Sequence, residues 1–257
     1  MREHAGEEVN LVHEDETLDD LVRDGLKVIQ AIDGYRFSMD AVLLSHFSEV
    51  RNNESVLDMG CGSGVIATLI ASLQPECSVT GLEIQESLAD RARRSLRLNQ
   101  LSHRVKIITG DLRDCKTILQ GQKFSQVVTN PPFWRAGEGK TPNDQENLVA
   151  RHEAEANLND FIEAAAGLLS HHGRLSLIQR AARTDEIIRR CHEHNLVASR
   201  IRFVHPKANK PANLVLVEAV KGGRGYLNVL PPLIVYSENG QYTAELLDIY
   251  FGKEERA

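Results

Sequence analysis

The stretch Asn130-Pro131-Pro132-Phe133 has the residue types needed to hold a flat amino group. An asparagine side-chain oxygen and the backbone carbonyls beside it accept hydrogen bonds from a donor such as an exocyclic NH2 group. The phenylalanine offers an apolar face on which a base can stack. Two consecutive prolines lack backbone donors, so the chain must leave a sheet at this point. The plainer alternative is an ordinary exit from a strand into a loop, which Asn-Pro pairs also favour.

The elements that position this stretch alternate between strands and helices. We predict strands at 54–59, 77–83, 104–109, 124–129, 173–179, 199–204 and 213–220, and helices at 65–73, 85–99, 157–170 and 184–194. Such alternation is typical of βαβ units and a parallel sheet. Only the turn-like residues 205–212 join the last two strands, which should therefore be antiparallel. The sequence thus predicts an α/β fold with a seven-stranded, mostly parallel sheet, an antiparallel terminal hairpin and helices on both faces.

The residues before this pattern are predicted to form an N-terminal extension, 1–50, to a domain that spans 51–257. Residues 1–20 are typical of a peripheral acidic arm, and residues 28–37 of a hairpin that turns at Asp33-Gly34. A helix should begin after Ser38, a favoured N-cap residue. Further along, the polar insertion 134–156 lies beside the Asn130 stretch, where a long loop is typical of a substrate-facing lid.

The composition is that of a soluble globular protein of one or two domains, with 257 residues, 42% hydrophobic and 26% charged. No apolar run approaches the ~18 residues of a membrane span. The first residues are polar and acidic, unlike a signal peptide. Four scattered cysteines indicate reduced thiols and a cytoplasmic location.

The charge distribution is uneven. The net charge of −6 argues against a nucleic-acid partner, but residues 199–225 hold six basic side chains and one acid, Glu218. The six are Arg200, Arg202, Lys207, Lys210, Lys221 and Arg224. A local basic face matters more for phosphate binding than the global sum, so Lys207 and Lys210 are predicted substrate contacts. A solvated rim is the alternative interpretation.

The first strand runs into a glycine-rich loop, Asp58-Met59-Gly60-Cys61-Gly62-Ser63-Gly64. A dinucleotide fingerprint needs Gly or Ala where this chain has Val65, which disfavours an oxidoreductase. The loop instead resembles the S-adenosylmethionine loop of Rossmann-like methyltransferases. That resemblance places Asp58 near the methionine amino group and Gly60, Cys61, Gly62 and Gly64 under the nucleoside.

The next two strands also end in acids. Glu83, followed by Ile84, ends the second strand, where a carboxylate can accept both ribose hydroxyls. The third strand runs into Asp111-Leu112, and by the same resemblance Asp111 accepts from the adenine amino group. Each acid alone is also typical of a turn or a helix cap. Features at four successive strand ends of one sheet edge predict a binding site for S-adenosyl-L-methionine.

Segments across nearly the whole chain resemble the bacterial tRNA adenine-N6 methyltransferases of the valine tRNA 1 adenine-37 type. They are 37–44, Ala150-Arg151-His152-Glu153, 203–208 and 230–236, together with the Asn130 stretch. The resemblance implies tRNA as partner, catalysis by Asn130 to Phe133, and Ser38 and Asp40 at the methionine end of the cofactor pocket. Trp134, Arg151 and His152 then become candidate substrate contacts. The group often has Tyr at the position of Phe133. The phenylalanine of this chain can still stack on a base, but it cannot form the hydrogen bond of a phenolic hydroxyl.

An amino group conjugated to a base ring is a poor nucleophile. We expect Asn130 Oδ1 and the Pro131 carbonyl to accept its two N–H groups and so free a lone pair in line with the methyl donor. No His or Glu base is needed, because the extra proton becomes acidic after transfer. The base must leave any stack first, which is easiest in a single-stranded loop.

Three alternative functions remain beside the disfavoured oxidoreductase. Ribosomal guanine-N2 and protein-glutamine methylation use the same amino chemistry, although glutamine enzymes usually carry an added N-terminal domain and only about fifty residues precede the loop here. A non-catalytic RNA-binding module would not need the cofactor residues.

Zinc binding at Cys191-His192-Glu193-His194 lacks a second ligand pair, so we expect a polar helix end and no metal. A monomer is slightly favoured.

Overall fold

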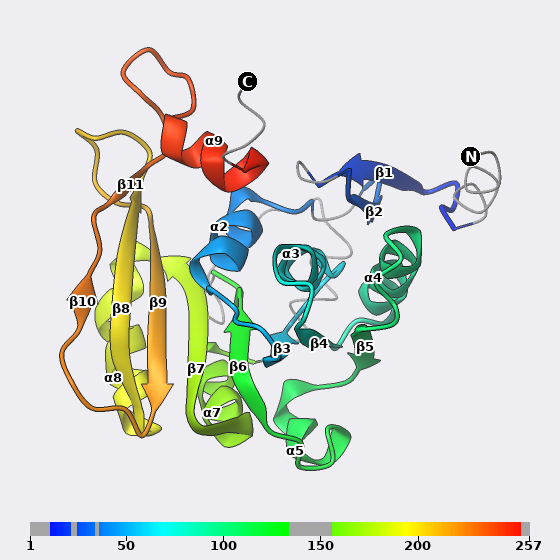
Figure 1. The fold of residues 1–257 in the computed structure, drawn as a ribbon, viewed down its shortest axis with the longest axis horizontal. Helices are drawn as coiled ribbons and strands as arrows, with labels where there is room; N and C mark the ends of the chain where they lie inside the picture. Colours follow the sequence, from blue (N-terminus) through cyan, green and yellow to red (C-terminus); the bar gives the residue numbers. More distant parts are fainter. Residues whose placement is uncertain (1–10, 22–24, 34–35, 134–155, 253–257) are drawn as a thin grey trace.

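A mixed sheet forms the centre of the protein in the computed structural model, which describes residues 11–21, 25–33, 36–133 and 156–252. Its seven long strands run in the order β5-β4-β3-β6-β7-β9-β8 (Figure 1). Their bounds are β3 Ser55–Met59, β4 Ser78–Glu83, β5 Val105–Thr109, β6 Phe124–Thr129, β7 Leu169–Arg180, β8 Leu196–His205 and β9 Leu214–Lys221. All seven predicted strands are therefore confirmed.

The strand directions also follow the prediction. β3, β4, β5, β6 and β7 pair in parallel, whereas β9 is antiparallel to both β7 and β8. Two short strands that the sequence did not indicate, β10 (Asn228–Val229) and β11 (Leu233–Ile234), pair in parallel with β8 at the outer edge. Strands of two residues carry no periodic pattern, so sequence reasoning has nothing to detect there.

Helices cover both faces of the sheet because its strands are apolar on both sides. The helices at one face are α2 (Met39–Phe47), α3 (Val65–Leu73), α4 (Glu86–Leu98) and α9 (Ala244–Phe251), and those at the other are α5 (Cys115–Ile118), α7 (Leu158–Leu168) and α8 (Thr184–Glu193). Successive residues of β6 show this division, because Val127 packs in one core and Val128 in the other. No helix in the described ranges is long and apolar enough to cross a membrane.

The hairpin predicted within 28–37 is wrong. Strand β2 (Lys27–Ala31) pairs antiparallel with β1 (Glu16–Asp20), a segment that the sequence had assigned to a peripheral arm. Gly25, which has a φ of 67°, lies between these two strands, so the sequence pair Asp24-Gly25 falls in their connection. The hairpin lies over α4, where the Ile29 N–H donates to Ser95 Oγ at 2.9 Å.

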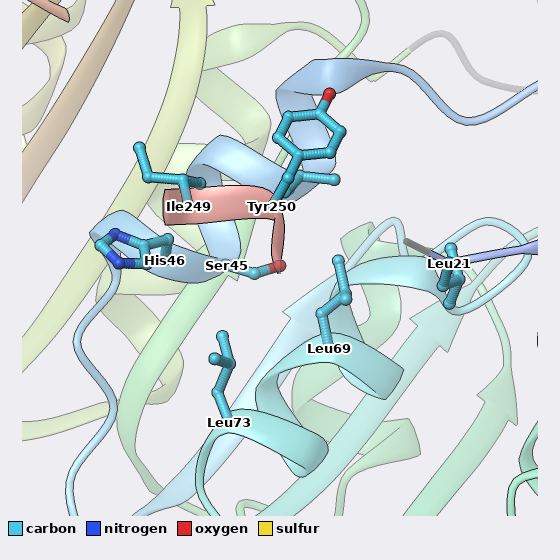
Figure 2. Close-up of a pocket in the computed structure, with 8 residues that line it drawn as sticks. Leu21, Ser45, His46, Leu69, Leu73, Ile249 and Tyr250 are labelled. Carbon is cyan, nitrogen blue, oxygen red and sulfur yellow. The ribbon is translucent and has the colours of Figure 1, made fainter. Parts of the chain in front are cut away.

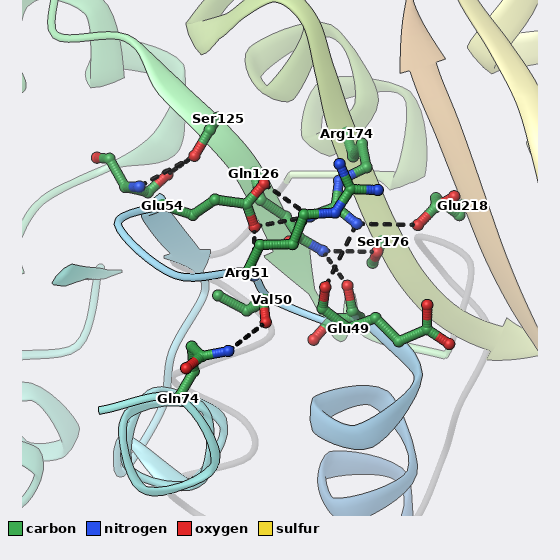
Figure 3. A network of polar contacts seen from close by, with 12 residues as sticks. Glu49, Val50, Arg51, Glu54, Gln74, Ser125, Gln126, Arg174, Ser176 and Glu218 are labelled. Carbon is green, nitrogen blue, oxygen red and sulfur yellow. Dashed lines mark hydrogen bonds and ion pairs between the residues drawn. The ribbon is translucent and has the colours of Figure 1, made fainter. Parts of the chain in front are cut away.

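A buried polar network fastens the amino ends of the central strands (Figure 3). Arg174 of β7 donates to both carboxylate oxygens of Glu54 at 2.8 and 2.7 Å and to Gln126 Oε1 at 2.9 Å. Gln126 of β6 in turn donates to the Ser48 carbonyl after α2 at 2.7 Å. Pairing of this kind is required once a guanidinium is buried. The network fixes α2 relative to the sheet at the edge opposite the predicted site.

Candidate active site

Three glycines shape the turn from β3 into α3. Gly60, Gly62 and Gly64 have φ values of 73°, 54° and 80°, a region that other residues rarely adopt. A Cβ atom at Gly64 would lie 3.0 Å from the Ala92 Cβ, whereas one at Gly62 would meet nothing within 4 Å. One side of the turn is thus packed closely on α4 and the backbone at Gly62 is open to a ligand.

Asp58 lies at the end of β3 and is fully buried. Its Oδ2 accepts a hydrogen bond from the Ala67 N–H at 3.0 Å, which ties the strand to α3. Its Oδ1 is buried and finds no hydrogen-bond partner among the described residues. Burial raises the pKa of Asp58 to about 7, and the Glu83 carboxylate adds to the rise. A buried acceptor without a partner is costly, so this atom fits a ligand that brings a donor.

Glu83 ends β4 beside the glycine turn. Its Oε2 accepts from the Gly62 N–H at 2.8 Å and its Oε1 from the Gln85 N–H at 2.9 Å. Burial raises the pKa of this carboxyl as well. Ile84 follows as a half-buried apolar side chain. The buried Cys61 thiol, whose pKa burial raises well above its usual value, fills space in the turn as an un-ionised group.

Asp111 follows β5 and has a partner that the sequence analysis did not foresee. Its Oδ1 accepts from the Arg113 N–H at 2.8 Å and its Oδ2 from the Arg113 guanidinium Nε at 2.8 Å. The hydrogen bonds from Arg113 hold the pKa of Asp111 below its usual range. Asp111 is therefore an ionised cap of the short helix η1 (Leu112–Asp114), with the buried Leu112 next to it.

Asn130 follows directly after β6. The strand register pairs Val128 with Asp58, so Asn130 and Asp58 leave neighbouring strands at the same edge of the sheet. The Thr129 hydroxyl donates to the Met59 carbonyl at 2.8 Å and holds the two strand ends together. Like Asp58 Oδ1, Asn130 Oδ1 is buried without a partner among the described residues. Two buried oxygen acceptors without a partner among the described residues therefore lie on adjacent strand ends, and they indicate the candidate site.

Gln179 of β7 is a site residue that the sequence analysis missed. It is fully buried, and its Nε2 donates to the Pro131 and Pro132 carbonyls at 3.5 and 3.3 Å. Its Oε1 accepts from the Arg180 N–H at 2.9 Å. The available signal was an uncharged polar residue near the end of an apolar strand that neighbours β6. Pro131 is buried, while Pro132 is exposed and Phe133 is half-buried.

Ser38 and Asp40 lie at the start of α2. Ser38 occupies the predicted N-cap position, but its side chain donates to Asp40 Oδ2 at 2.9 Å and does not cap the helix. Burial raises the pKa of the Asp40 carboxyl. The α9 helix packs on α2. An apolar pocket between α2, α3 and α9, lined by residues such as Leu69, Leu73 and Ile249, contains none of the predicted site residues (Figure 2).

Five of the six basic residues in 199–225 divide into two groups, and the sixth, Arg224, is exposed just after β9. Arg200 donates to the Phe47 carbonyl at 2.7 Å, Arg202 to Glu245 at 2.5 Å, and Lys221 to the Ala166 carbonyl at 2.6 Å. Arg200, Arg202 and Lys221 therefore already have hydrogen-bond partners within the protein. Lys207 and Lys210 lie on the loop that connects β8 and β9. Trp134, Arg151 and His152 lie outside the described residues.

The sheet order and the site define the class I fold of S-adenosyl-L-methionine-dependent methyltransferases, with that molecule as cofactor. A family model described as the methyltransferase small domain matches residues 38–204, which is more than half of the chain. The chain belongs to this family.

Solved structures agree with this assignment. A structure described as a predicted O-methyltransferase from Agrobacterium tumefaciens aligns with a TM-score of 0.67 at 25% identity, over 82% of this chain and 95% of that one. The TrmN structure from Thermus thermophilus aligns with a TM-score of 0.51 at 22% identity, over 70% of this chain and 47% of that one, and shows the fold alone.

Curated relatives carry a more specific name. The tRNA1(Val) (adenine(37)-N6)-methyltransferase of Porphyromonas gingivalis is 32% identical over 189 residues, which cover 71% of this chain and 73% of that protein. The protein of the same name from Aeromonas hydrophila is 29% identical over 213 residues, which cover 82% of this chain and 86% of that protein.

Proposed function

We propose that the protein transfers a methyl group from S-adenosyl-L-methionine to the N6 amino group of an adenine in tRNA, at the position 3′ of the anticodon. The observation that carries this proposal is the buried Asn130 Oδ1. Neither this atom nor Asp58 Oδ1, one strand away, has a hydrogen-bond partner within the part of the chain that the structure describes. The names of the relatives from Porphyromonas gingivalis and Aeromonas hydrophila supply the base and the kind of RNA. Guanine-N2 and protein-glutamine acceptors fit Asn130 chemically, but no relative described above carries such a name.

The residues of the sheet edge fit the cofactor. Its methionine part carries an ammonium group, which is the kind of donor that Asp58 Oδ1 lacks. The open backbone at Gly62 can approach a flat nucleoside, and Glu83 can accept ribose hydroxyls beside it. Ser38, Asp40 and Asp111 complete the proposed pocket. The bound cofactor supplies a methyl group that its sulfonium centre has already activated.

The remaining residues hold the acceptor. Asn130 Oδ1 and the Pro131 carbonyl accept the two N–H groups of the amino nitrogen, and Phe133 stacks on the base. Gln179 keeps both proline carbonyls in place. Positioning of this kind is the main contribution that a protein makes when the donor is already activated. The proposed reaction uses no metal ion.

The residues that contact the tRNA are also part of this proposal. Lys207 and Lys210 are proposed to contact the tRNA, and the proposed substrate contacts at Trp134, Arg151 and His152 lie outside the described residues. We further propose that the enzyme works in the cytoplasm, where tRNA is processed.

Mass spectrometry of nucleosides in purified tRNA from a strain that lacks the gene tests the proposal. We expect N6-methyladenosine to disappear from one tRNA and to return when the wild-type chain is expressed, but not when Asn130→Ala is expressed. An unchanged tRNA profile together with a lost N2-methylguanosine in ribosomal RNA, or a lost methylglutamine in a protein, would replace adenine with another amino acceptor.

A further inference from the structure

Three tyrosine rings stack beside the carboxy-terminal helix. The ring centroids of Tyr236 and Tyr242 are 5.2 Å apart with an interplanar angle of 23°, and those of Tyr242 and Tyr250 are 6.2 Å apart with an angle of 21°. Tyr236 and Tyr250 pack against the hydrophobic core, whereas Tyr242 is 42% exposed. We call these three residues the tyrosine stack. Tyr236 and Tyr250 are anchored in the core, and Tyr242, which contacts both rings, exposes part of its side chain to solvent.

Backbone contacts make the tyrosine stack rigid. Tyr236 and Tyr242 form an isolated β-bridge, and the Ser237 N–H donates to the Gln241 carbonyl at 2.9 Å. Thr243 caps α9 and also donates through its hydroxyl to the Ile234 carbonyl at 2.6 Å. A side chain held in this way loses little conformational freedom when a flat ligand stacks on it.

The tyrosine stack lies at the functional end of the sheet. The strand ends of β8 and β11 and the helix α9 are at the same end as the start of α2 (Figure 1). Helix α9, which carries Tyr250, packs on α2. Burial raises the pKa of Tyr250 to about 12, and the neighbouring Tyr242 and Asp40 add to the rise. In Figure 2 the Tyr250 hydroxyl points away from Leu69 and Leu73. The stack therefore borders the proposed cofactor side of the molecule.

Positive charge adjoins the tyrosine stack. The Tyr236 N–H donates to the Pro206 carbonyl at 2.9 Å, so the stack touches the loop that carries Lys207 and Lys210. Glu245 on α9 is neutralised by Arg202 at 2.5 Å. Stacking aromatics next to cations are the combination by which proteins bind single-stranded nucleic acid.

We propose that the tyrosine stack, with Lys207 and Lys210, is the docking platform for an unpaired base that neighbours the target adenine in the RNA substrate. This inference rests on the proposed function. Withdrawal of one base from a loop leaves its neighbours unstacked, and an exposed aromatic ring can replace the lost stacking partner. Every base has a π-face, so the platform contributes affinity and position while the Asn130 site selects the amino group.

Substitution of Tyr242 tests the platform because that side chain is the exposed one. Tyr242→Ala should raise both the Kd for an anticodon stem-loop and the KM for tRNA by about five-fold or more, since base stacking contributes ~1–3 kcal/mol. The kcat at saturating RNA and the Kd for S-adenosylhomocysteine should not change, whereas the melting temperature should fall because the ring contacts with Tyr236 and Tyr250 are lost. Tyr242→Phe should behave as wild type. Glu238→Gln, which removes a negative charge from the same exposed turn, should tighten RNA binding.

Tyr226 provides the matched control, because it is 99% exposed and lies between β9 and β10 at the opposite end of the sheet. Tyr226→Ala should leave the Kd and KM for RNA unchanged. 2-Aminopurine beside the target adenine should lose fluorescence on binding wild type and keep it with Tyr242→Ala. If tRNA is methylated and Tyr242→Ala has wild-type Kd and KM, the platform is wrong and the proposed function stands. If tRNA is not methylated but Tyr242→Ala still weakens RNA binding, the proposed function fails and only the RNA-binding role of the tyrosine stack stands.

Discussion

The side-chain Nε2 of Gln179 lies 3.3 Å from the carbonyl oxygen of Pro132 and 3.5 Å from that of Pro131. The two prolines offer no backbone N–H through which the sheet could hold them. A buried amide from the neighbouring strand supplies the missing restraint. The position of the Pro131 carbonyl, a proposed acceptor for the substrate amino group, therefore depends on a side chain from β7.

Gln179→Leu should lower kcat by up to about 100-fold, since a small displacement of a positioning group has effects of that size. The Kd for S-adenosylhomocysteine should stay unchanged, because the hydrogen bonds of the Gln179 side chain within the described residues go to the Asn130 stretch and to the Arg180 N–H. Gln179→Glu should have as low a kcat as Gln179→Leu at neutral pH. Its kcat relative to wild type should rise as the pH falls, because only the protonated carboxyl can donate a hydrogen bond to the proline carbonyls. A leucine variant with wild-type kcat would show that the two carbonyls need no restraint.

Asn130→Ala should abolish methyl transfer without lowering stability. Asn130 Oδ1 is buried with no partner among the described residues, and such an acceptor destabilises the unliganded protein by ~1–3 kcal/mol. Its removal should therefore keep or raise the melting temperature, while cofactor binding by calorimetry is retained. Asn130→Asp keeps the oxygen and tests whether a neutral side chain is required. Near-normal turnover of the alanine variant would rule out Asn130 as the acceptor of the substrate amino group.

Asp58 should make the unliganded protein less stable as the pH rises from about 4 to about 7. An unfolded aspartate titrates near pH 4, whereas burial raises the pKa of folded Asp58 to about 7. Between these values the folded state holds a proton that the unfolded state has lost, so the free energy of unfolding falls with pH. Urea unfolding of Asp58→Asn and wild type should diverge by at most ~1.4 kcal/mol per pH unit across this window. Parallel pH profiles of the two proteins would contradict the assignment.

Lys207 and Lys210 should contribute to the salt dependence of tRNA binding. Each phosphate contact contributes about −0.7 to −0.9 to the slope of log affinity against log salt concentration. Lys207→Ala/Lys210→Ala should flatten the slope by up to two such contributions and leave cofactor affinity unchanged. The control Lys106→Ala/Lys116→Ala removes the same charge from exposed positions on β5 and α5, near the other edge of the sheet. Equal slopes in the two double variants would place the RNA elsewhere.

Periodic, buried segments made most of the fold predictable. Each long strand of the sheet and the helices α3, α4, α7 and α8 have an apolar pattern that repeats within the segment itself. The N-terminal hairpin was misplaced because the chain contains two Asp-Gly pairs and β1 is acidic. Glu16 in β1 is buried only because Arg91 and Arg94 of α4 bind it at 3.1 and 2.6 Å, a long-range pairing that local sequence does not show.

The positions of the candidate residues Asp58, Glu83 and Asn130 at strand ends were predictable. Contacts between segments far apart in the chain were not predictable. Gln179 donates a hydrogen bond to the Pro131 carbonyl, which is 48 residues away in the chain, and Arg200 donates to the Phe47 carbonyl of α2. Arg113 lies only two residues from Asp111 and donates to its carboxylate. The residue types alone, however, do not show whether Asp111 caps a helix or contacts a ligand.

Transfer of a deuterium-labelled methyl group tests the role of the Asn130 site most directly. Purified protein is incubated with labelled S-adenosyl-L-methionine and unmodified tRNA, which is then digested and analysed by mass spectrometry. Labelled N6-methyladenosine should appear in a fragment that contains the adenine 3′ of the anticodon, with wild type and not with Asn130→Ala. Label on guanine, on protein or on no acceptor, or equal labelling by the two proteins, would contradict methylation of adenine at Asn130.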